Sequence, residues 1–179
     1  MKALKEFTIP FVGLKIGTHH FEYNVEPTFF EHFEYEDFND ANIHVDLELE
    51  KKTTLLELHF KISGWVKVNC DLTNEPYNQT IENEFNLVVK FGEEYNDEHV
   101  DILIIPHGTY EINIQQYIYE LVILAVPLKR IHPGVEDGTL DSDILKKLEE
   151  LSPKLEKDKN KDEDIDPRWN TLKRLLTDK

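Results

Sequence analysis

The sequence predicts an α+β fold. We expect a mostly antiparallel, bent β-sheet or open barrel, packed on one central helix and followed by C-terminal helices. Three observations support this fold class. Apolar and polar residues alternate with a period of two between residues 43 and 62, which is typical of strands with one buried face. Apolar residues recur at helical spacing between residues 113 and 126, and the sequence beyond residue 134 becomes highly charged.

The strands are expected in the first hundred residues. Residues 7–46 mix aromatic and β-branched residues with polar ones, which favours strands and loops. The polar residues 51–54 predict a hairpin turn between two runs, each with its apolar residues on one face: Ile43, Val45, Leu47 and Leu49, then Leu56, Leu58, Phe60 and Ile62. These runs predict two antiparallel strands with one shared buried face.

Turn and strand signals alternate in the segment that follows. Gly64 interrupts the second run, which indicates either a β-bulge or a close approach of two backbones, with a bend in the strand. Residues 71–79 are expected to form a loop, residues 80–91 a further strand and residues 92–99 an acidic loop. Pro106 divides the next apolar run into a short strand, a turn and the approach to a helix.

The central helix is predicted from its caps. Asn113 with Gln116 three residues later matches a capping box, and Pro127 is expected to end the helix. Apolar residues surround most of this segment, so the helix should be covered on more than one side by a curved sheet. Residues 1–134 are therefore expected to form a β-rich body around a helix at residues 113–126.

Residues 135–179 are expected to form a charged helical appendage. A short amphipathic helix is predicted around Leu145 and Leu148, and a linker of mixed charge at residues 156–164. Asp166 followed by Pro167 is a favoured helix start, so a last helix is predicted there. No internal repeat interrupts this two-part organisation.

Charge and cysteine content limit the possible functions. The net charge of −16 argues against a general nucleic-acid binder, because affinity for phosphate comes from Lys and Arg. Residues 141–179 nevertheless hold half of the 20 basic residues, so a polyanion would be contacted there and a basic protein by the body. With one cysteine, no secretory signal and no apolar stretch long enough to cross a bilayer, we expect a cytoplasmic protein without membrane contact.

Four segments carry a resemblance to a known family: FVGLKIGTHHFEYNV, ISGWVKVNCDLT, INIQQYIYELVILAVPLKRIHP and DPRWNTLKRLL. In this order they resemble the YceD family, a conserved bacterial domain of unknown function tied to accumulation of large-subunit ribosomal RNA, in the form found in Bacteroidetes-like bacteria. The resemblance implies RNA binding or association with assembling ribosomes. None of the four segments is a catalytic signature.

The sequence departs from the family pattern at its cysteines. Many members have a second cysteine three positions after the first and a cysteine-rich stretch after the long helix that resembles a zinc ribbon. Here Thr73 stands three positions after Cys70, and residues 135–166 contain no cysteine. One thiolate cannot build a tetrahedral zinc site, so we expect no metal and no cofactor.

Cys70, the histidines and the acidic clusters can each be explained without a catalytic or metal-binding role. Cys70 is either a nucleophile, which needs a base beside it, or, as we expect, a buried thiol at the end of a strand. The histidines are scattered without a ligand spacing. The acidic clusters at residues 31–37 and 93–98 match no calcium loop and are expected to be solvated, with capture of a basic partner as the alternative. We therefore expect no catalytic residues and no small-molecule substrate, and an unrecognised hydrolase is the least favoured hypothesis.

The leading hypothesis is a non-enzymatic ribosome-biogenesis accessory that binds large-subunit precursor rRNA or an early assembly particle. The alternative is an acidic adaptor for a basic ribosomal protein. The candidate partner or RNA-binding residues are Arg168, Trp169, Lys173, Arg174, Lys129 and Arg130. The terminal helix that contains four of them either docks on the body or on another copy through Trp169 and its leucines, or binds a partner groove or RNA phosphates.

Overall fold

The computed structural model describes residues 4–140 and 143–152. The chain divides into two compact units, residues 1–142 and residues 143–179. The strands of the first unit are β1 (Thr8–Ile9), β2 (Gly17–Val25), β3 (Asp40–Lys51), β4 (Leu55–Asn69), β5 (Pro76–Gly92), β6 (Asn96–His99), β7 (Ile102–Pro106) and β8 (Ile112–Asn113). Its helices are α1 (Pro27–Glu31), α2 (Gln115–Ala125) and α3 (Pro133–Glu136), with 3-10 turns at Lys5–Phe7 and Phe11–Gly13.

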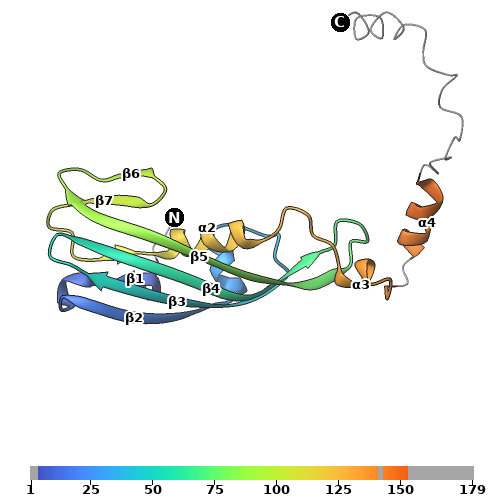
Figure 1. The fold of residues 1–179 in the computed structure, drawn as a ribbon, viewed down its shortest axis with the longest axis horizontal. Coiled ribbons are helices and arrows are strands. Elements are labelled where there is room, and N and C mark those ends of the chain that lie inside the picture. The colour runs from blue at the N-terminus through green and yellow to red at the C-terminus, as the bar shows by residue number, and fades with distance from the viewer. Residues whose placement is uncertain (1–3, 141–142, 153–179) are drawn as a thin grey trace, which may run out of the picture. The chain divides into compact units, whose positions relative to one another are not determined.

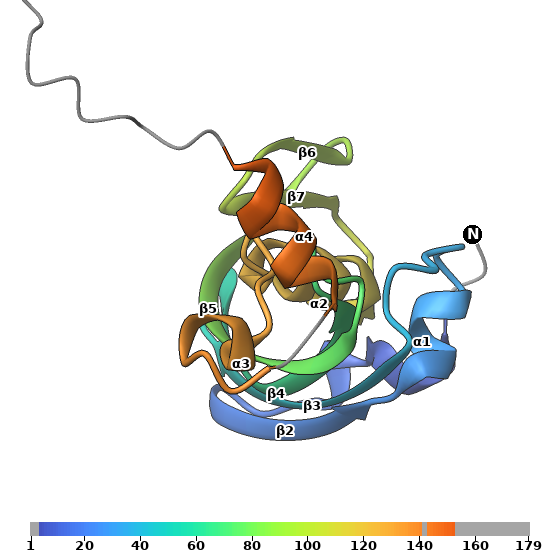
Figure 2. The same ribbon diagram turned by 90° about the vertical axis from the view of Figure 1, so that its right-hand side faces the viewer.

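Six of these strands form one sheet in the order β2-β3-β4-β5-β7-β6 (Figure 1). β2 to β5 form an antiparallel meander, β7 runs parallel to β5, and β6 returns antiparallel to β7. β1 and β8 form a separate antiparallel pair. Seen end on in Figure 2, the sheet curves round α2 without closing. The predicted α+β fold, a bent and mostly antiparallel sheet around one helix, is confirmed.

One face of the sheet is apolar because alternate residues of β3, β4 and β5 are apolar. The strand pairing places Leu47 opposite Phe60, and Phe60 opposite Phe85. α2 covers this face with Ile118 and Val122, which are fully buried. Burying an apolar side chain of this size contributes about 1.5–3 kcal/mol, so the covered face is the main source of stability. The hairpin predicted from the alternation is confirmed.

Gly64 marks a close approach of two backbones. The pairing of β3 with β4 continues through Gly64 without a register shift, with Gly64 opposite Ile43. Gly64 has a φ of 153°, and a Cβ there would collide with the carbonyl oxygen of Asn42 and lie 2.8 Å from the Cα of Ile43. The neighbouring strand thus occupies the space of a side chain. Of the two predicted alternatives the close approach is confirmed, and the bulge is wrong.

α2 begins two residues later than predicted. Its N-cap is Ile114, whose side chain makes no capping hydrogen bond. Asn113, which ends β8, still accepts a hydrogen bond at 3.1 Å from the backbone N–H of Gln115. The side chain of Gln116 donates to Glu120 at 2.6 Å instead of reaching back to Asn113. The predicted capping box is therefore wrong, because Asn113 is held in a strand, although its side chain still satisfies one N–H group of the first turn.

Several short elements, including α1, α3, β6 and β8, and the start of one strand were not predicted. α1 lies in the aromatic segment expected to contain strands and loops; it places Pro27 in its first turn and buries Phe29 and Phe30. These rings begin an aromatic cluster that reaches α2, where Phe33 stacks on Tyr119 with ring centroids 4.1 Å apart. β6 lies in the segment expected to be an acidic loop, and β5 begins at Pro76, inside the other segment expected to be a loop.

The second unit is described through one helix, α4 (Asp143–Leu151), which confirms the short amphipathic helix predicted there. The predicted linker at residues 156–164 and the predicted helix from Pro167 lie outside the described residues. Among the helices that the structure describes, none has the length and apolar character needed to span a membrane.

Replacement of Gly64 by alanine tests the close approach. Because the new Cβ meets the backbone of β3 and the glycine φ is one that other residues rarely adopt, Gly64→Ala should lower the free energy of unfolding by about 1–3 kcal/mol. Urea unfolding measures this change. Gly13→Ala is the control, since a Cβ there has no atom within 4 Å, and it should change stability by less than about 0.5 kcal/mol. Equal effects of the two substitutions would contradict the assignment.

Because of the partly buried phenol of Tyr23 on β2, we expect the protein to lose stability at high pH. Its ring packs on Phe7 at 5.3 Å, and burial, with a smaller effect of Glu6, raises the pKa of Tyr23 to about 12. A pKa that is higher in the folded than in the unfolded chain contributes stability that is complete below about pH 10 and is lost as the pH rises towards 12. Urea unfolding at stepped pH should therefore show a falling free energy over this window. Tyr23→Phe should flatten the fall, whereas the exposed Tyr110→Phe should not.

Candidate functional site

Two of the six predicted partner residues are described, and they lie just after α2. Lys129 is exposed to solvent, and Arg130 is half-buried. The other four candidates lie outside the described residues: Arg168, Trp169, Lys173 and Arg174. The structure therefore places only the Lys129–Arg130 end of the predicted set.

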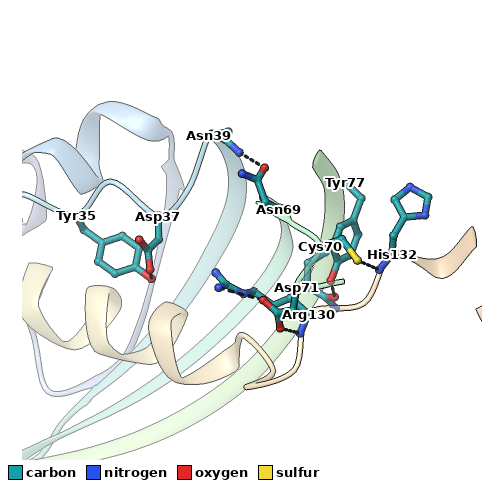
Figure 3. Close-up of polar contacts among 10 residues, drawn as sticks. Tyr35, Asp37, Asn39, Asn69, Cys70, Asp71, Tyr77, Arg130 and His132 are labelled. Carbon is teal, nitrogen blue, oxygen red and sulfur yellow. Dashed lines mark hydrogen bonds and ion pairs between the residues drawn. The ribbon is translucent and has the colours of Figure 1, made fainter. Parts of the chain in front are cut away.

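Arg130 is held against the loop between β4 and β5 by Asp71 (Figure 3). Its guanidinium Nη2 lies 3.4 Å from Asp71 Oδ1, and its backbone N–H donates to Asp71 Oδ2 at 2.7 Å. The backbone N–H of Asp71 in turn donates to the Arg130 carbonyl at 2.8 Å. Three contacts between the same two residues fasten the chain after α2 to the end of the sheet. A phosphate that approached Arg130 would meet a guanidinium already paired with a carboxylate.

Cys70, which follows β4, is only 2% exposed, as expected for a buried thiol. Its sulfur accepts a hydrogen bond at 3.3 Å from the backbone N–H of His132, and Figure 3 shows the imidazole turned away from the sulfur. The imidazole Nδ1 accepts a hydrogen bond at 2.9 Å from the N–H of Gly134 and so caps α3. The ring also packs on Tyr77 at 5.4 Å. The two residues thus meet through the backbone, and the imidazole is engaged in holding α3.

Hydrogen bonds set the ionisation of this thiol. Burial raises the pKa of Cys70, but hydrogen bonds from the Thr73 hydroxyl and from the backbone N–H groups of His132, Thr73 and Leu72 outweigh it, so the pKa lies below its usual value. Thr73, which stands where the family resemblance leads one to expect a second cysteine, is itself buried. The buried thiol of Cys70 and hydroxyl of Thr73 therefore help to hold the backbone of the loop between β4 and β5 in place.

Three histidines of the sheet, His20, His44 and His59, lie on its outer, polar face. His20 lies 3.8 Å from Glu48, and His44 lies 3.3 Å from Asp46. His59 contacts the side chain of Asn86 on the neighbouring strand. Within residues 4–140 and 143–152, no three His, Cys, Asp or Glu side chains are grouped so that they could hold a metal ion. This face is an open polar surface of imidazoles and carboxylates.

A groove of about 580 Å³ is lined by α2 and by the β6–β7 end of the sheet. Its apolar lining includes Phe85, Leu103, Ile105, Ile112, Tyr117 and Leu121. Four carboxylates also line it: Asp97, Glu98, Glu111 and Glu120. None of the described residues that line the groove is Lys or Arg. We call this feature the acidic groove.

Apolar side chains remain exposed in the acidic groove. Leu124 is 78% exposed at the end of α2, and Tyr95 and Val100, which flank β6, are 58% and 84% exposed. Exposed apolar residues that lie together beside polar ones mark interaction sites on protein surfaces. The groove therefore offers both apolar contact and negative charge.

Burial and the neighbouring carboxylates raise the pKa values of the two phenols of the acidic groove, Tyr95 and Tyr117. Burial raises the pKa of Tyr117 strongly, and Tyr95, Asp97 and Glu120 raise it further. Burial also raises the pKa of Tyr95, and so does Asp97, which accepts a hydrogen bond at 3.2 Å from the Tyr95 hydroxyl. The contribution of the carboxylates to both shifts reflects their unfavourable interaction with a further negative charge on either phenol.

The acidic groove was not predicted from the sequence. Asp97 and Glu98 were expected to lie in a solvated loop, whereas they lie on β6 beside α2. Apart from Phe85, the lining residues lie between residues 95 and 124, but they are spread over β6, β7, β8, α2 and the connecting loops, and no spacing in the sequence brings them together. The available signal was weak: an acidic cluster interrupted by Tyr95, and a helix that is apolar on more faces than the sheet can cover.

Comparison with known proteins identifies the family. A family model described as Large ribosomal RNA subunit accumulation protein YceD matches residues 58–176. This range contains three of the four segments that carry the resemblance, residues 62–73, 112–133 and 166–176, and leaves out the first. A search of curated proteins found no match, and neither did a search of solved structures. Because the family model covers more than half of the sequence, the chain belongs to the YceD family of large ribosomal RNA subunit accumulation proteins.

Proposed function

We propose that this protein is a cytoplasmic, non-enzymatic accessory of ribosome biogenesis. It associates with the precursor of the large ribosomal subunit and supports the accumulation of its RNA. The observation that carries the proposal is the match to the YceD family over residues 58–176, whose description names this role. The structure supports recognition in place of catalysis in one respect: the buried Cys70 contacts His132 through the backbone, and the imidazole of that histidine caps α3.

Direct contact with precursor RNA is best supplied by the C-terminal part of the chain. Residues 141–179 contain 10 basic and 11 acidic side chains, whereas residues 1–140 contain 10 and 25. RNA phosphates are bound by Lys and Arg that release counterions, and unpaired bases stack on aromatic rings. The last segment of the family match offers both groups: Arg168, Trp169, Lys173 and Arg174.

A second candidate function is an adaptor for a basic ribosomal protein. It is favoured by the charge of residues 1–140, in which acidic side chains exceed basic ones by 15. A surface of this sign speeds encounter with cationic partners and repels RNA. The two functions are compatible within one assembly particle, because the acidic and the less acidic parts of the chain suit its protein and its RNA components respectively.

Depletion of the protein tests the leading function. Mature large-subunit RNA should fall relative to small-subunit RNA, and the wild-type protein should restore it. In a sucrose gradient the protein should sediment with large-subunit precursor particles and be absent from mature subunits. Hybridisation with probes for both RNAs and immunodetection across the gradient measure these outcomes. Unchanged large-subunit RNA after depletion would refute the proposal.

A salt titration separates RNA contact from protein contact. If Lys173 and Arg174 neutralise phosphates, the double variant Lys173→Ala/Arg174→Ala should weaken binding to precursor RNA. It should also lower the slope of log affinity against log salt by about 0.7 for each lost contact with single-stranded RNA. Fluorescence anisotropy at stepped salt measures the slope. The exposed pair Lys5→Ala/Lys15→Ala removes the same charge elsewhere and should leave the slope unchanged. An equal loss in both variants would show that only the net charge matters.

A further inference from the structure

The carboxylates of the acidic groove determine the charge of whatever it binds. Asp97, Glu98, Glu111 and Glu120 are all exposed, and no Lys or Arg lies among the described lining residues. RNA and anionic lipids present phosphates, which this ring of carboxylates repels. A segment rich in Lys and Arg is attracted instead. The charge therefore selects a basic protein partner over a nucleic acid or a membrane surface.

The apolar side chains determine the second property of the partner. Leu124 and Val100 leave more than three quarters of their surface in water, and Tyr95 more than half. A purely cationic, hydrophilic segment would leave this surface uncovered. A partner that inserts apolar side chains between the two walls of the groove removes this apolar surface from water. Each Å² buried contributes about 25 cal/mol to the free energy of binding.

Charge and apolar contact lie side by side on both walls of the acidic groove. On α2, Glu120 and Leu124 are four residues apart and so share one helix face. On the facing wall, Tyr95 and Asp97 are two residues apart, and the hydroxyl of the first donates to the carboxylate of the second. A partner that satisfies both walls needs apolar side chains flanked closely by cationic ones, which is the pattern of an amphipathic segment.

We propose that the acidic groove binds an amphipathic, Lys- and Arg-rich segment of a basic protein component of the assembling large subunit. This proposal rests on the proposed function and gives its second candidate a site and a partner chemistry. The apolar side chains of the segment pack on Leu124 and Tyr95, and its cations pair with Asp97 and Glu120. RNA contact belongs to a different part of the chain.

The binding test uses the full chain and short synthetic peptides. The probe is a fluorescent peptide with Trp and Leu on one helical face and Lys on the other; its comparison peptides replace each Lys by Glu, or each Trp and Leu by Ser. We expect saturable binding of the Lys peptide alone, weakened by rising salt. Amide chemical-shift changes should centre on Tyr95 and Leu124. Binding of the Glu peptide or equal binding of the Ser peptide would each overturn the proposal.

Matched variants separate the groove from net charge. Asp97→Asn/Glu120→Gln should weaken binding of the Lys peptide by about tenfold or more. Glu22→Gln/Glu82→Gln removes the same charge from the outer sheet face and should change it by less than about twofold. Leu124→Ser should weaken binding, whereas Leu128→Ser should not, because Leu128 is fully exposed and outside the groove. Thermal unfolding of each variant shows that all are folded. Equal effects within either pair would overturn the proposal.

A sedimentation experiment keeps this inference distinct from the function on which it rests. The wild-type protein and the Asp97→Asn/Glu120→Gln variant are compared in gradients of precursor particles. Weaker sedimentation of the variant with these particles supports the groove as a particle contact. If both proteins sediment equally with the particles, the groove proposal fails and the function stands. If the wild-type protein does not sediment with them, the function itself fails.

Discussion

The fold depends on the need to cover one apolar face of the β2–β5 meander. The alternating residues of β3 and β4 place Leu47, Phe60 and their neighbours on that face, and a curved sheet of this length leaves them open to water unless another element fills its concavity. α2 does so with Ile118 and Val122. The aromatic cluster that begins on α1 closes one side of the helix, with Phe33 stacked on Tyr119. The attachment of the chain after α2 and the acidic groove both depend on how far α2 covers the apolar face of the sheet.

Where α2 covers the apolar face of the sheet completely, the neighbouring polar groups stabilise the fold. The chain that leaves α2 returns to the end of β4 and is fastened there by the contacts between Asp71 and Arg130 and by the hydrogen bond from the His132 backbone to Cys70. Where the cover runs out, beside β6 and β7, apolar residues of α2 and the sheet remain exposed next to carboxylates. The proposed partner site therefore lies at the edge of the same core that stabilises the protein.

The sequence allowed the fold class to be predicted, because the period of two in β3 and β4 and the helical spacing near Ile118 are local patterns that the core requires. It did not allow α1 or β6 to be predicted, since both are short and depend on tertiary contacts. The start of α2 was misplaced because Asn113 also pairs in a strand. The burial of Cys70 followed from residue type. The acidic groove did not, because β6, β7 and α2 line it together only after the sheet has curved. The YceD resemblance came from whole segments, and it is the part of the functional prediction that the comparisons confirm.

β6 is one of the two edge strands of the sheet, and it is also part of the acidic groove. A free strand edge exposes backbone donors and acceptors that a second copy can join, which is a common route to aggregation. Here that edge is only four residues long and contains two neighbouring carboxylates, Asp97 and Glu98, so two copies aligned edge to edge would bring like charges together. The same side chains that are proposed to attract a cationic partner thus disfavour pairing of two copies through this edge. A Lys-rich segment that neutralised them would need to shield the edge as well.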